Sequence, residues 1–356
     1  MKRSRCLPVK FFSEIHGQDN AINLLRRSFN RQMISHAYLF CGPSGVGKRT
    51  CAEAFARALL CRQPLQGDAC GECRSCRQVE GGNHPDFIIV EPEGGSIKIE
   101  QAREIQRRMT LAPFQGGRQI CLIDRAESMT DEAANCFLKT LEEPPAGVVF
   151  ILTCVQPYAL LTTVLSRCQQ VMFQLLPVSQ VALILACLPG VKQEEADLTA
   201  LLSGGSVGQA FELLGGGNLT ERRKQLAQII NALDSAGLGE ACRLAGSLLS
   251  GNKEQSIREQ TLTWIEGLML WYRDLLIWKE SENEKLIINR DFLQVIKEQA
   301  SRREAALLID RLGKIEEARN RLSKNANPRL VLDVLFLNLC RPAGGKQGDG
   351  FSASHK

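Results

Sequence analysis

The stretch of sequence that decides the fold is HAYLFCGPSGVGKRT, residues 36–50. Its first half, His36–Gly42, is a short apolar run that ends in glycine, which is typical of a buried strand. From Lys48 to Leu60 the apolar spacing becomes helical. Glycines in GPSGVGK (42–48) let the backbone fold around an anion, and the first amides of the following helix point toward that anion. Strand, loop and helix in this order predict a nucleotide-binding phosphate loop that contains Gly42, Gly45, Gly47 and Lys48.

Short strands and helices alternate outward from this stretch. Helical spacing appears at 11–35, 97–111 and 130–142, and apolar runs at 87–90, 119–124 and 148–154 predict strands. This alternation predicts a parallel sheet covered by helices on both faces. After about residue 177 the strands stop, and Trp264, Trp271 and Trp278, spaced by seven, are expected to pack in a helical core. We expect an α/β core at 1–177, a helical lid at 178–216, an all-α domain at 217–340 and a disordered tail at 341–356.

The magnesium ligands of a phosphate loop are incomplete in this sequence. The residue after Lys48 should carry a hydroxyl group that ligates magnesium, and here it is Arg49. Thr50 follows, but one step along a helix turns a side chain by about 100°, so Thr50 does not simply substitute. Asp124 ends the strand ICLID and could hold the metal, yet Arg125 stands where an active hydrolase places the glutamate that activates water. The pattern predicts nucleotide binding without efficient hydrolysis.

Four cysteines are clustered in a glycine-rich insert. Cys61, Cys70, Cys73 and Cys76 have the spacing C-x8-C-x2-C-x2-C. Zinc binds four thiolates tetrahedrally, and a C-x2-C turn brings two sulfurs to one ion. This spacing predicts a structural zinc site at 61–76; the alternatives are four unrelated thiols or an iron–sulfur site, because C-x2-C-x2-C also occurs in ferredoxins.

Composition limits the class of protein. The chain has 356 residues, of which 44% are hydrophobic and 23% charged, as in an ordinary globular protein. No apolar run reaches the roughly 18 residues that cross a bilayer, and the basic start lacks the apolar stretch of a secretory signal. We therefore expect a cytoplasmic protein that does not bind membranes. The net charge of +5 is compatible with nucleic acid as a partner but is weak evidence for it.

Several motifs together resemble one family. GQDNAINLLRRS (17–28), the phosphate loop, the four-cysteine insert, LIDRAESMTDEAANCFLKTLEEPP (122–145) and NANPRLVLDVLFLNL (325–339) are similar to AAA+ subunits of bacterial DNA polymerase III clamp loaders. The resemblance spans residues 11–340. It implies an AAA+ core with a helical lid and an all-α collar that holds a ring of five subunits, with ATP sites between neighbours.

The resemblance also implies roles for single residues. Arg167 in the Ser166–Arg167–Cys168 motif resembles the arginine finger that reaches a neighbour's ATP; the alternative is a surface ion pair. Thr153 matches the first sensor position. The second sensor should be an arginine, but Gly208 or Gln209 stands there. The finger offered to a neighbour is therefore intact, whereas the chain's own hydrolytic residues are not.

Within the family this combination is similar to the delta-prime type. That type implies a subunit of the polymerase III holoenzyme with poor or no ATPase alone, acting in the bacterial replisome. Its implied partners are gamma/tau and delta subunits in a hetero-pentamer, the sliding clamp and primed DNA. The alternatives are an active gamma/tau-type motor and a zinc-dependent nucleic-acid enzyme. Arg49 and Arg125 argue against the motor, and the enzyme would need an open metal position with a nearby base.

One basic helix is a candidate for contact with DNA. Arg103 and Arg107 in IKIEQAREIQRR (97–108) are four residues apart and share a helix face. The resemblance implies that this helix lines the central chamber and follows the phosphate backbone. The alternative is that Arg103 pairs with Glu100 or Glu104 on the same helix.

Overall fold

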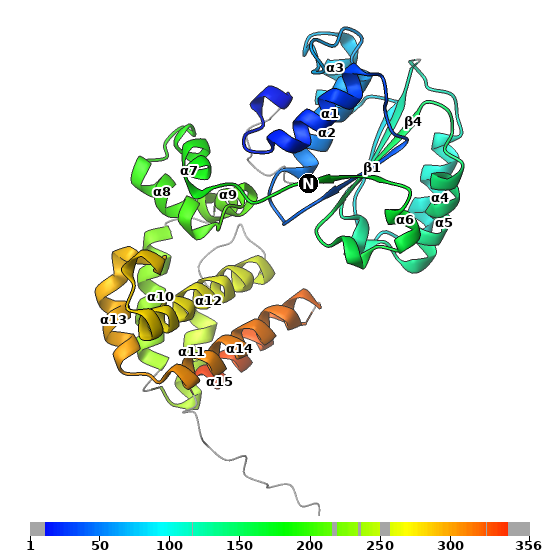
Figure 1. Cartoon of the computed structure of the whole chain (residues 1–356). Helices are drawn as coiled ribbons and strands as arrows, with labels where there is room; N and C mark the ends of the chain where they lie inside the picture. Colours follow the sequence, from blue (N-terminus) through cyan, green and yellow to red (C-terminus); the bar gives the residue numbers. More distant parts are fainter. Residues whose placement is uncertain are drawn as a thin grey trace, which may run out of the picture. The chain divides into compact units, whose positions relative to one another are not determined.

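The computed structural model describes residues 11–115, 117–215, 219–233, 236–249, 257–324 and 326–340. The chain divides after Gly215 into two compact units (Figure 1). The expected tail at 341–356 and the predicted boundary near residue 217 lie outside the described residues. Within the described part, no helix is both long and apolar enough to cross a membrane.

A parallel sheet of five strands forms the centre of the first unit, in the order β2-β3-β4-β1-β5. The strands are β1 Ala37–Cys41, β2 Phe87–Val90, β3 Gln119–Ile123, β4 Val148–Cys154 and β5 Gln169–Met172. In register, Cys41 lies beside Cys154 and Ile123 beside Leu152. The carboxyl ends of β1, β3 and β4 thus meet at one edge, where the phosphate loop and Asp124 follow their strands. The sequence predicts this parallel sheet with a phosphate loop at its carboxyl edge.

Helices cover both faces of this sheet because successive strand residues point to opposite sides. On one face, α1 (Asp19–Asn30) and α2 (Lys48–Leu60) pack on Tyr38 and Phe40, and on the other, α4 (Ile99–Met109) and α5 (Asp131–Glu142) pack on Leu39 and Phe150. Figure 1 shows α4 and α5 on the side of the sheet away from α1 and α2. The insert contributes α3 (Arg74–Glu80), and α6 (Thr162–Leu165) precedes β5. Two short 3-10 turns, η2 (Ala126–Ser128) and η3 (Pro157–Ala159), follow β3 and β4.

Two sequence predictions in this unit are wrong. Residues 11–35 are not one helix: a 3-10 turn, η1 (Phe12–Glu14), is separated from α1 by Gly17, whose positive φ of 74° interrupts helical geometry. The edge strand β5 was not predicted. Its sequence QQVM has one buried side chain, Val171, so it lacks the apolar run that identifies a central strand.

Three short helices complete the first unit. They are α7 (Val178–Ala186), α8 (Gln193–Leu202) and α9 (Val207–Gly215), and they share a small core that includes Val181, Leu185, Ala196 and Ala200. The amide of Leu176 donates to the carbonyl of Gly205 at 2.9 Å, which ties the end of the sheet segment to the turn before α9.

The second unit is helical throughout its described residues. Its elements are α10 (Leu219–Leu233), α11 (Leu238–Ser247), α12 (Ile257–Ser281), η4 (Glu284–Leu286), η5 (Arg290–Phe292), α13 (Leu293–Ser301), α14 (Ala305–Ser323) and α15 (Pro328–Cys340). The prediction that the tryptophans pack in a core is confirmed: Trp264 and Trp271 are buried in α12, and Trp278 packs against the same cluster.

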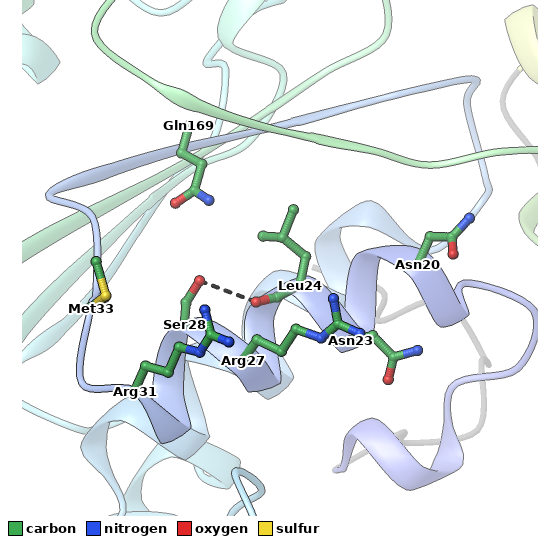
Figure 2. A pocket seen from close by; sticks show the side chains of 8 residues that line it. All are labelled: Asn20, Asn23, Leu24, Arg27, Ser28, Arg31, Met33 and Gln169. Atoms are coloured by element: carbon green, nitrogen blue, oxygen red, sulfur yellow. Dashed lines mark hydrogen bonds between the residues drawn. The ribbon is translucent and has the colours of Figure 1, made fainter.

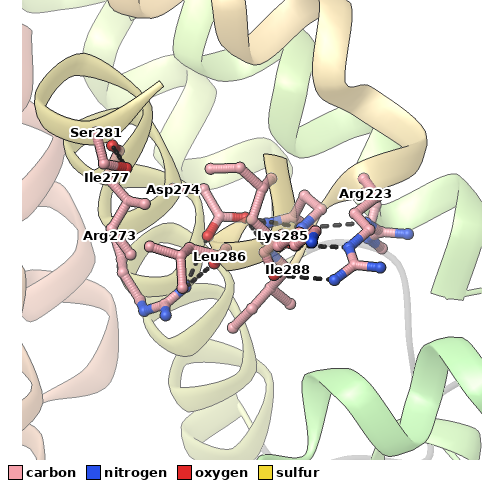
Figure 3. Close-up of polar contacts among 11 residues, drawn as sticks. Arg223, Arg273, Asp274, Ile277, Ser281, Lys285, Leu286 and Ile288 are labelled. Carbon is pink, nitrogen blue, oxygen red and sulfur yellow. Dashed lines mark hydrogen bonds and ion pairs between the residues drawn. The ribbon is translucent and has the colours of Figure 1, made fainter. Parts of the chain in front are cut away.

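A buried carboxylate fixes the turn after α12. The side chain of Asp274 is fully buried and accepts hydrogen bonds from the amides of Ile288 and Asn289, at 3.0 and 2.7 Å (Figure 3). It also pairs with Arg273 at 2.8 Å. Arg223 of α10 donates to Asn289 and to Asp291, so the same turn is joined to a second helix. A buried charge is tolerated only with such partners, and these contacts define one conformation of the segment.

Candidate nucleotide and metal sites

The phosphate loop has the backbone that its glycines predict. Gly45 and Gly47 adopt positive φ angles of 73° and 93°, and Gly47 is the left-handed N-cap of α2. A Cβ atom on Gly42 would collide with the carbonyl oxygen of Phe173, so only glycine fits at that position. The loop therefore places the first turn of α2, with its free amides, at the carboxyl edge of the sheet.

Lys48 lies inside this loop. Its side chain is buried, and Nζ donates to the carbonyls of Gly42 and Pro43, both at 2.7 Å. Burial lowers the pKa of Lys48 from its usual value, and the negative charge of nearby Glu127 opposes that shift. The ammonium group thus occupies the centre of the loop, where an anion would bind.

Arg49 is surrounded by carboxylates. Its Nε donates to Glu53 at 2.9 Å, and its Nη1 pairs with Glu91 and, at 3.3 Å, with Asp124. Burial disfavours the charged guanidinium, but the hydrogen bonds to Glu53 and Glu91 outweigh burial and raise the pKa of Arg49. Thr50, the next residue, is half-buried in α2, and no hydrogen bond to Asp124 is found for it in the described part of the chain.

Asp124 and Thr153 form a short bridge between β3 and β4. The hydroxyl of Thr153 donates to Asp124 Oδ1 at 2.6 Å and accepts from the amide of Arg125 at 3.0 Å. Arg125 is exposed and has a left-handed backbone with φ of 55°. Glu127 accepts from the amide of Val155 at 3.1 Å through Oε1, while its Oε2 is buried without a hydrogen-bond partner among the described residues. The Glu127 carboxylate is therefore held against the residue that follows β4.

These residues do not fit a magnesium ion. Magnesium requires near-octahedral oxygen ligands, which a phosphate loop supplies through a hydroxyl group and a carboxylate. The hydroxyl position is Arg49, and both oxygens of Asp124 are already engaged, one by Thr153 and one by Arg49. The nucleotide site thus retains its loop and lysine but lacks free oxygen ligands for a divalent cation.

The start of α9 and the residue before it pack directly on the phosphate loop. The amide of Gly208 donates to the carbonyl of Gly45 at 2.8 Å, and the hydroxyl of Ser206 donates to the carbonyl of Ser44 at 3.0 Å. A Cβ atom on Gly208 would lie 2.7 Å from Gly45 Cα. The two backbones therefore leave no room for a side chain at residue 208, which is one of the two candidates, with Gln209, for the second sensor position.

Arg167 lies on a different surface of the first unit, after α6. Its guanidinium donates to the carbonyl of Thr163 at 2.9 Å and forms an ion pair with Glu142 of α5 at 2.8 Å. A third of the Arg167 side chain and half of the Glu142 side chain are exposed. In the isolated chain Arg167 thus forms a surface ion pair, which was the alternative to an arginine finger. Both side chains of this pair are partly exposed to solvent.

The four cysteines of the insert converge as their spacing predicts. The Sγ atoms of Cys61, Cys70, Cys73 and Cys76 all lie within 4.8 Å of one another, and the distances 61–73 and 70–76 are both 4.0 Å. A tetrahedral ion with Zn–S bonds of about 2.3 Å requires sulfurs about 3.8 Å apart. The cluster therefore fits a four-coordinate metal ion.

Backbone amides already support thiolates in this cluster. The amides of Cys70, Cys73 and Cys76 each donate to a sulfur of another cluster cysteine, at 3.3 to 3.5 Å. Burial opposes ionisation of Cys73, but bonds from the amides of Arg62 and Cys76 and from the neighbouring thiols lower its pKa to about 6. Such amide–sulfur bonds stabilise the deprotonated form that binds metal.

The insert is attached to the core by a buried polar chain that the sequence analysis missed. Ser75 donates to the carbonyl of Leu60 at 2.7 Å and contacts His84 Nε2 at 2.9 Å. His84 Nδ1 accepts from the amide of Asp86, whose carboxylate accepts from the amides of Phe114 and Gln115. His84 is thus a structural residue outside the metal cluster.

The basic face of α4 is exposed. Arg107 forms an ion pair with Glu104, three residues before it, and Arg103 is exposed with no ion pair found in the described residues. The alternative, a pairing of Arg103 with Glu100 or Glu104, is not found among the described residues. Arg103 and Arg107 lie on the solvent side of α4, opposite the buried side chains of Ala102 and Ile105.

A polar pocket lies apart from these sites, between α1 and β5 (Figure 2). Figure 2 shows Arg27 and Arg31 extending from α1 on one side and Gln169 of β5 on the other. Its lining is Asn20, Asn23, Leu24, Arg27, Ser28, Arg31, Met33 and Gln169. Five of these residues belong to the motif at 17–28, but none of the candidate site residues lines the pocket.

The carboxylate partners of Arg49 were also missed from the sequence. Glu91 comes directly after β2, and residues that follow parallel strands meet at the same sheet edge. That position is the signal that could have identified Glu91. Glu53 is four residues after Arg49 on α2, a spacing that brings opposite charges together.

Known proteins match both units of the chain. A family model described as "DNA polymerase III, delta subunit" matches residues 17–177, and one described as "DNA polymerase III, delta subunit, C terminal" matches residues 217–340. DNA polymerase III subunit delta' of Bacillus subtilis (strain 168) is 32% identical over 325 residues, covering 90% of this chain and 96% of that protein. Subunit delta' of Escherichia coli (strain K12) is 31% identical over 309 residues, covering 85% and 88%. Subunit tau of Escherichia coli (strain K12) is 35% identical over 170 residues, which cover 48% of this chain and 26% of that protein.

Proposed function

Because the chain belongs to the family of DNA polymerase III delta' subunits, we propose that it completes the AAA+ ring of a clamp loader and lends Arg167 to a neighbour's ATP site. In this role it helps to load the sliding clamp onto primed DNA in the bacterial replisome, with gamma/tau and delta subunits as partners. The all-α second unit would serve as the collar through which the ring assembles, and the first unit would present the finger.

The observation that carries this proposal is the contrast between the chain's own nucleotide site and Arg167. At the nucleotide site, Asp124 is engaged by Arg49 and Thr153, and Arg125 replaces the glutamate that activates water. At the second sensor position the chain has Gly208 or Gln209 in place of an arginine. One group that phosphoryl transfer requires is therefore engaged and two are missing, and we infer weak or no ATP hydrolysis by this subunit.

Arg167 has the properties of a cation that can be offered to another protein. Its guanidinium is partly exposed, and Glu142, the one carboxylate found to pair with it in the described part of the chain, is half exposed. Exposed ion pairs contribute only about 0 to 1 kcal/mol, so exchanging Glu142 for a nucleotide phosphate on a neighbour costs little. A guanidinium placed there stabilises charge that develops on the transferred phosphoryl group.

We further propose that Cys61, Cys70, Cys73 and Cys76 hold a structural zinc ion. All four ligand positions are filled by sulfur, so no position remains for water or substrate. When bound, zinc would fix the insert as one folded module. The side chains of Ser75 and His84 would then join that module to the end of α2 and to β2.

Arg103 and Arg107 are proposed to contact the DNA backbone. Both are exposed on one face of α4, and Arg103 has no ion pair in the described residues, which leaves its charge for a phosphate. Contact of this kind is independent of sequence and weakens steeply with salt.

Two measurements test the central proposal. The purified chain should co-elute with gamma/tau and delta subunits in size-exclusion chromatography, and it should have negligible steady-state ATPase by itself. Robust turnover that Lys48→Ala abolishes would establish an active motor and overturn the proposal. Failure of the chain to co-elute with these subunits would contradict the assembly role. An unrelated AAA+ protein, which should not co-elute, is the negative control.

A further inference from the structure

Three carboxylates from three segments of the chain converge on Arg49. Glu53 lies one turn further along α2, Glu91 follows β2, and Asp124 follows β3. These positions surround the point where a phosphate loop holds its divalent cation, since the hydroxyl ligand of that cation would occupy residue 49. The guanidinium thus lies where the metal would lie, and it binds the carboxylate that would hold the metal.

We infer that Arg49 is a built-in replacement for the divalent cation, so that this site recruits no magnesium at any stage of the protein's action. A guanidinium carries one positive charge and directs its donors to carboxylates in a fixed plane. It satisfies Asp124 as a metal would, but it offers no exchangeable ligand positions and cannot coordinate two phosphate oxygens with water.

The surrounding charges explain why a cation must be present at all. Glu53, Glu91, Asp124 and Glu127 are four acidic groups near the loop, and Lys48 and Arg49 are the nearby cations. Without Arg49, Glu53, Glu91 and Asp124 would repel one another in a partly buried site. Asp124 is the most buried of the three, with 17% of its side chain exposed, and so depends most on a fixed positive partner.

This arrangement predicts a latent metal site that one substitution would uncover. Replacing Arg49 with threonine removes the resident cation and supplies the hydroxyl group beside Asp124 and Glu91. Oxygen ligands of this kind suit magnesium and manganese, whereas the four sulfurs of the insert do not, so manganese reports on this site alone.

The experiment measures manganese binding to the isolated, zinc-loaded full chain by the loss of the free Mn²⁺ signal in electron paramagnetic resonance. We expect Arg49→Thr to bind Mn²⁺ at least about tenfold more tightly than the wild type, and the double variant Arg49→Thr, Asp124→Asn to lose that gain. Arg49→Lys retains a cation and should stay at the wild-type level. Arg31→Thr removes the same charge just after the C-terminal end of α1, away from this site, and should also stay at the wild-type level.

Either of two results would overturn the inference. One is wild-type protein that binds Mn²⁺ as tightly as Arg49→Thr, and the other is correctly folded Arg49→Thr that gains no binding. Circular dichroism establishes folding in each variant. The inference deepens the proposed loss of hydrolysis at this site, yet the experiment uses neither nucleotide nor other subunits. A negative result would therefore leave assembly and the role of Arg167 to their own tests.

Discussion

The phosphate loop and the turn after α6 each present one arginine, and the two differ in how many acidic partners they have. Arg49 contacts three carboxylates that come from three segments of the chain. Arg167 contacts one carboxylate, that of Glu142, and two neutral oxygens. An arginine side chain can thus be fully engaged in ion pairs within its own chain, or it can keep a weak pair that another protein could replace. We propose that the number of fixed anions around the guanidinium decides between these outcomes.

The largest effect is expected from a change in the cysteine insert. It tests whether the phosphate loop and the turn after α6 keep their structure without that insert. Cys73→Ser should abolish zinc binding and destabilise the insert by more than about 3 kcal/mol, because binding energy of a structural metal is folding energy. Elemental analysis and limited proteolysis within residues 61–84 measure both effects. The exposed Cys187, replaced by serine, is the matched control.

Helix α2 joins this insert to the phosphate loop, since it begins at Lys48 and ends one residue before Cys61. Its buried side chains pack on the sheet, and we expect them to hold the loop in place without zinc. Loss of AAA+ core structure on zinc removal would contradict the separation of the two regions.

The second prediction concerns the available arginine. Arg167→Ala should leave assembly of the loader intact and lower its DNA-dependent ATPase at least about tenfold, because an arginine finger stabilises transition-state charge. Reconstituted loader with wild-type partner subunits provides the assay. Arg31→Ala, which removes an exposed arginine elsewhere in the first unit, controls for net charge. Unchanged turnover with Arg167→Ala would contradict the assignment of Arg167 as an arginine finger. Its contrast with Arg49 would then no longer hold.

The third prediction concerns the stability of the isolated chain, for which Arg49 should matter more than Arg167. Arg49→Ala should destabilise the isolated chain by about 1 kcal/mol, since it leaves three carboxylates without their cation, whereas Arg167→Ala should cost less than about 0.5 kcal/mol. Urea unfolding followed by circular dichroism measures both. Equal losses of stability would show that the number of partners does not distinguish the two arginines.

The smallest effect is expected at Glu142. Glu142→Gln removes the single anion that pairs with Arg167 and should change the stability of the isolated chain by less than about 0.5 kcal/mol, because the pair is exposed. Loader ATPase should stay within about twofold of wild type, since the finger must leave Glu142 to act. A tenfold loss would instead assign Glu142 a positioning role.

Much of the fold could be predicted because it depends on local patterns. Strands β1, β3 and β4 are continuous apolar runs that only a sheet covered on both faces can bury, and α2, α4 and α5 follow their spacing closely. The edge strand β5 could not be found in this way because its polar alternation, QQVM, resembles a loop. Helix α1 was extended too far because apolar residues continue on both sides of Gly17.

The site was predictable only in part, for a related reason. The missing hydroxyl at residue 49 and the missing glutamate at residue 125 follow from motif positions alone. The contacts that replace them join residues far apart in the chain, such as Arg49 with Glu91 and Arg167 with Glu142. One sequence does not specify which of many exposed acids lies opposite a given arginine. Spacing did suffice for the cysteines, because a metal cluster requires short turns.

The contact between Gly45 and Gly208 limits how this protein could become a motor. Changing residues 49 and 125 to those of an active hydrolase requires two substitutions at accessible positions. An arginine at residue 208 is different, because any side chain there meets the backbone of the phosphate loop. The backbone at the start of α9 would have to move away first and lose the hydrogen bonds from Gly208 and Ser206. An arginine at residue 208 therefore requires a change of backbone conformation as well as a substitution.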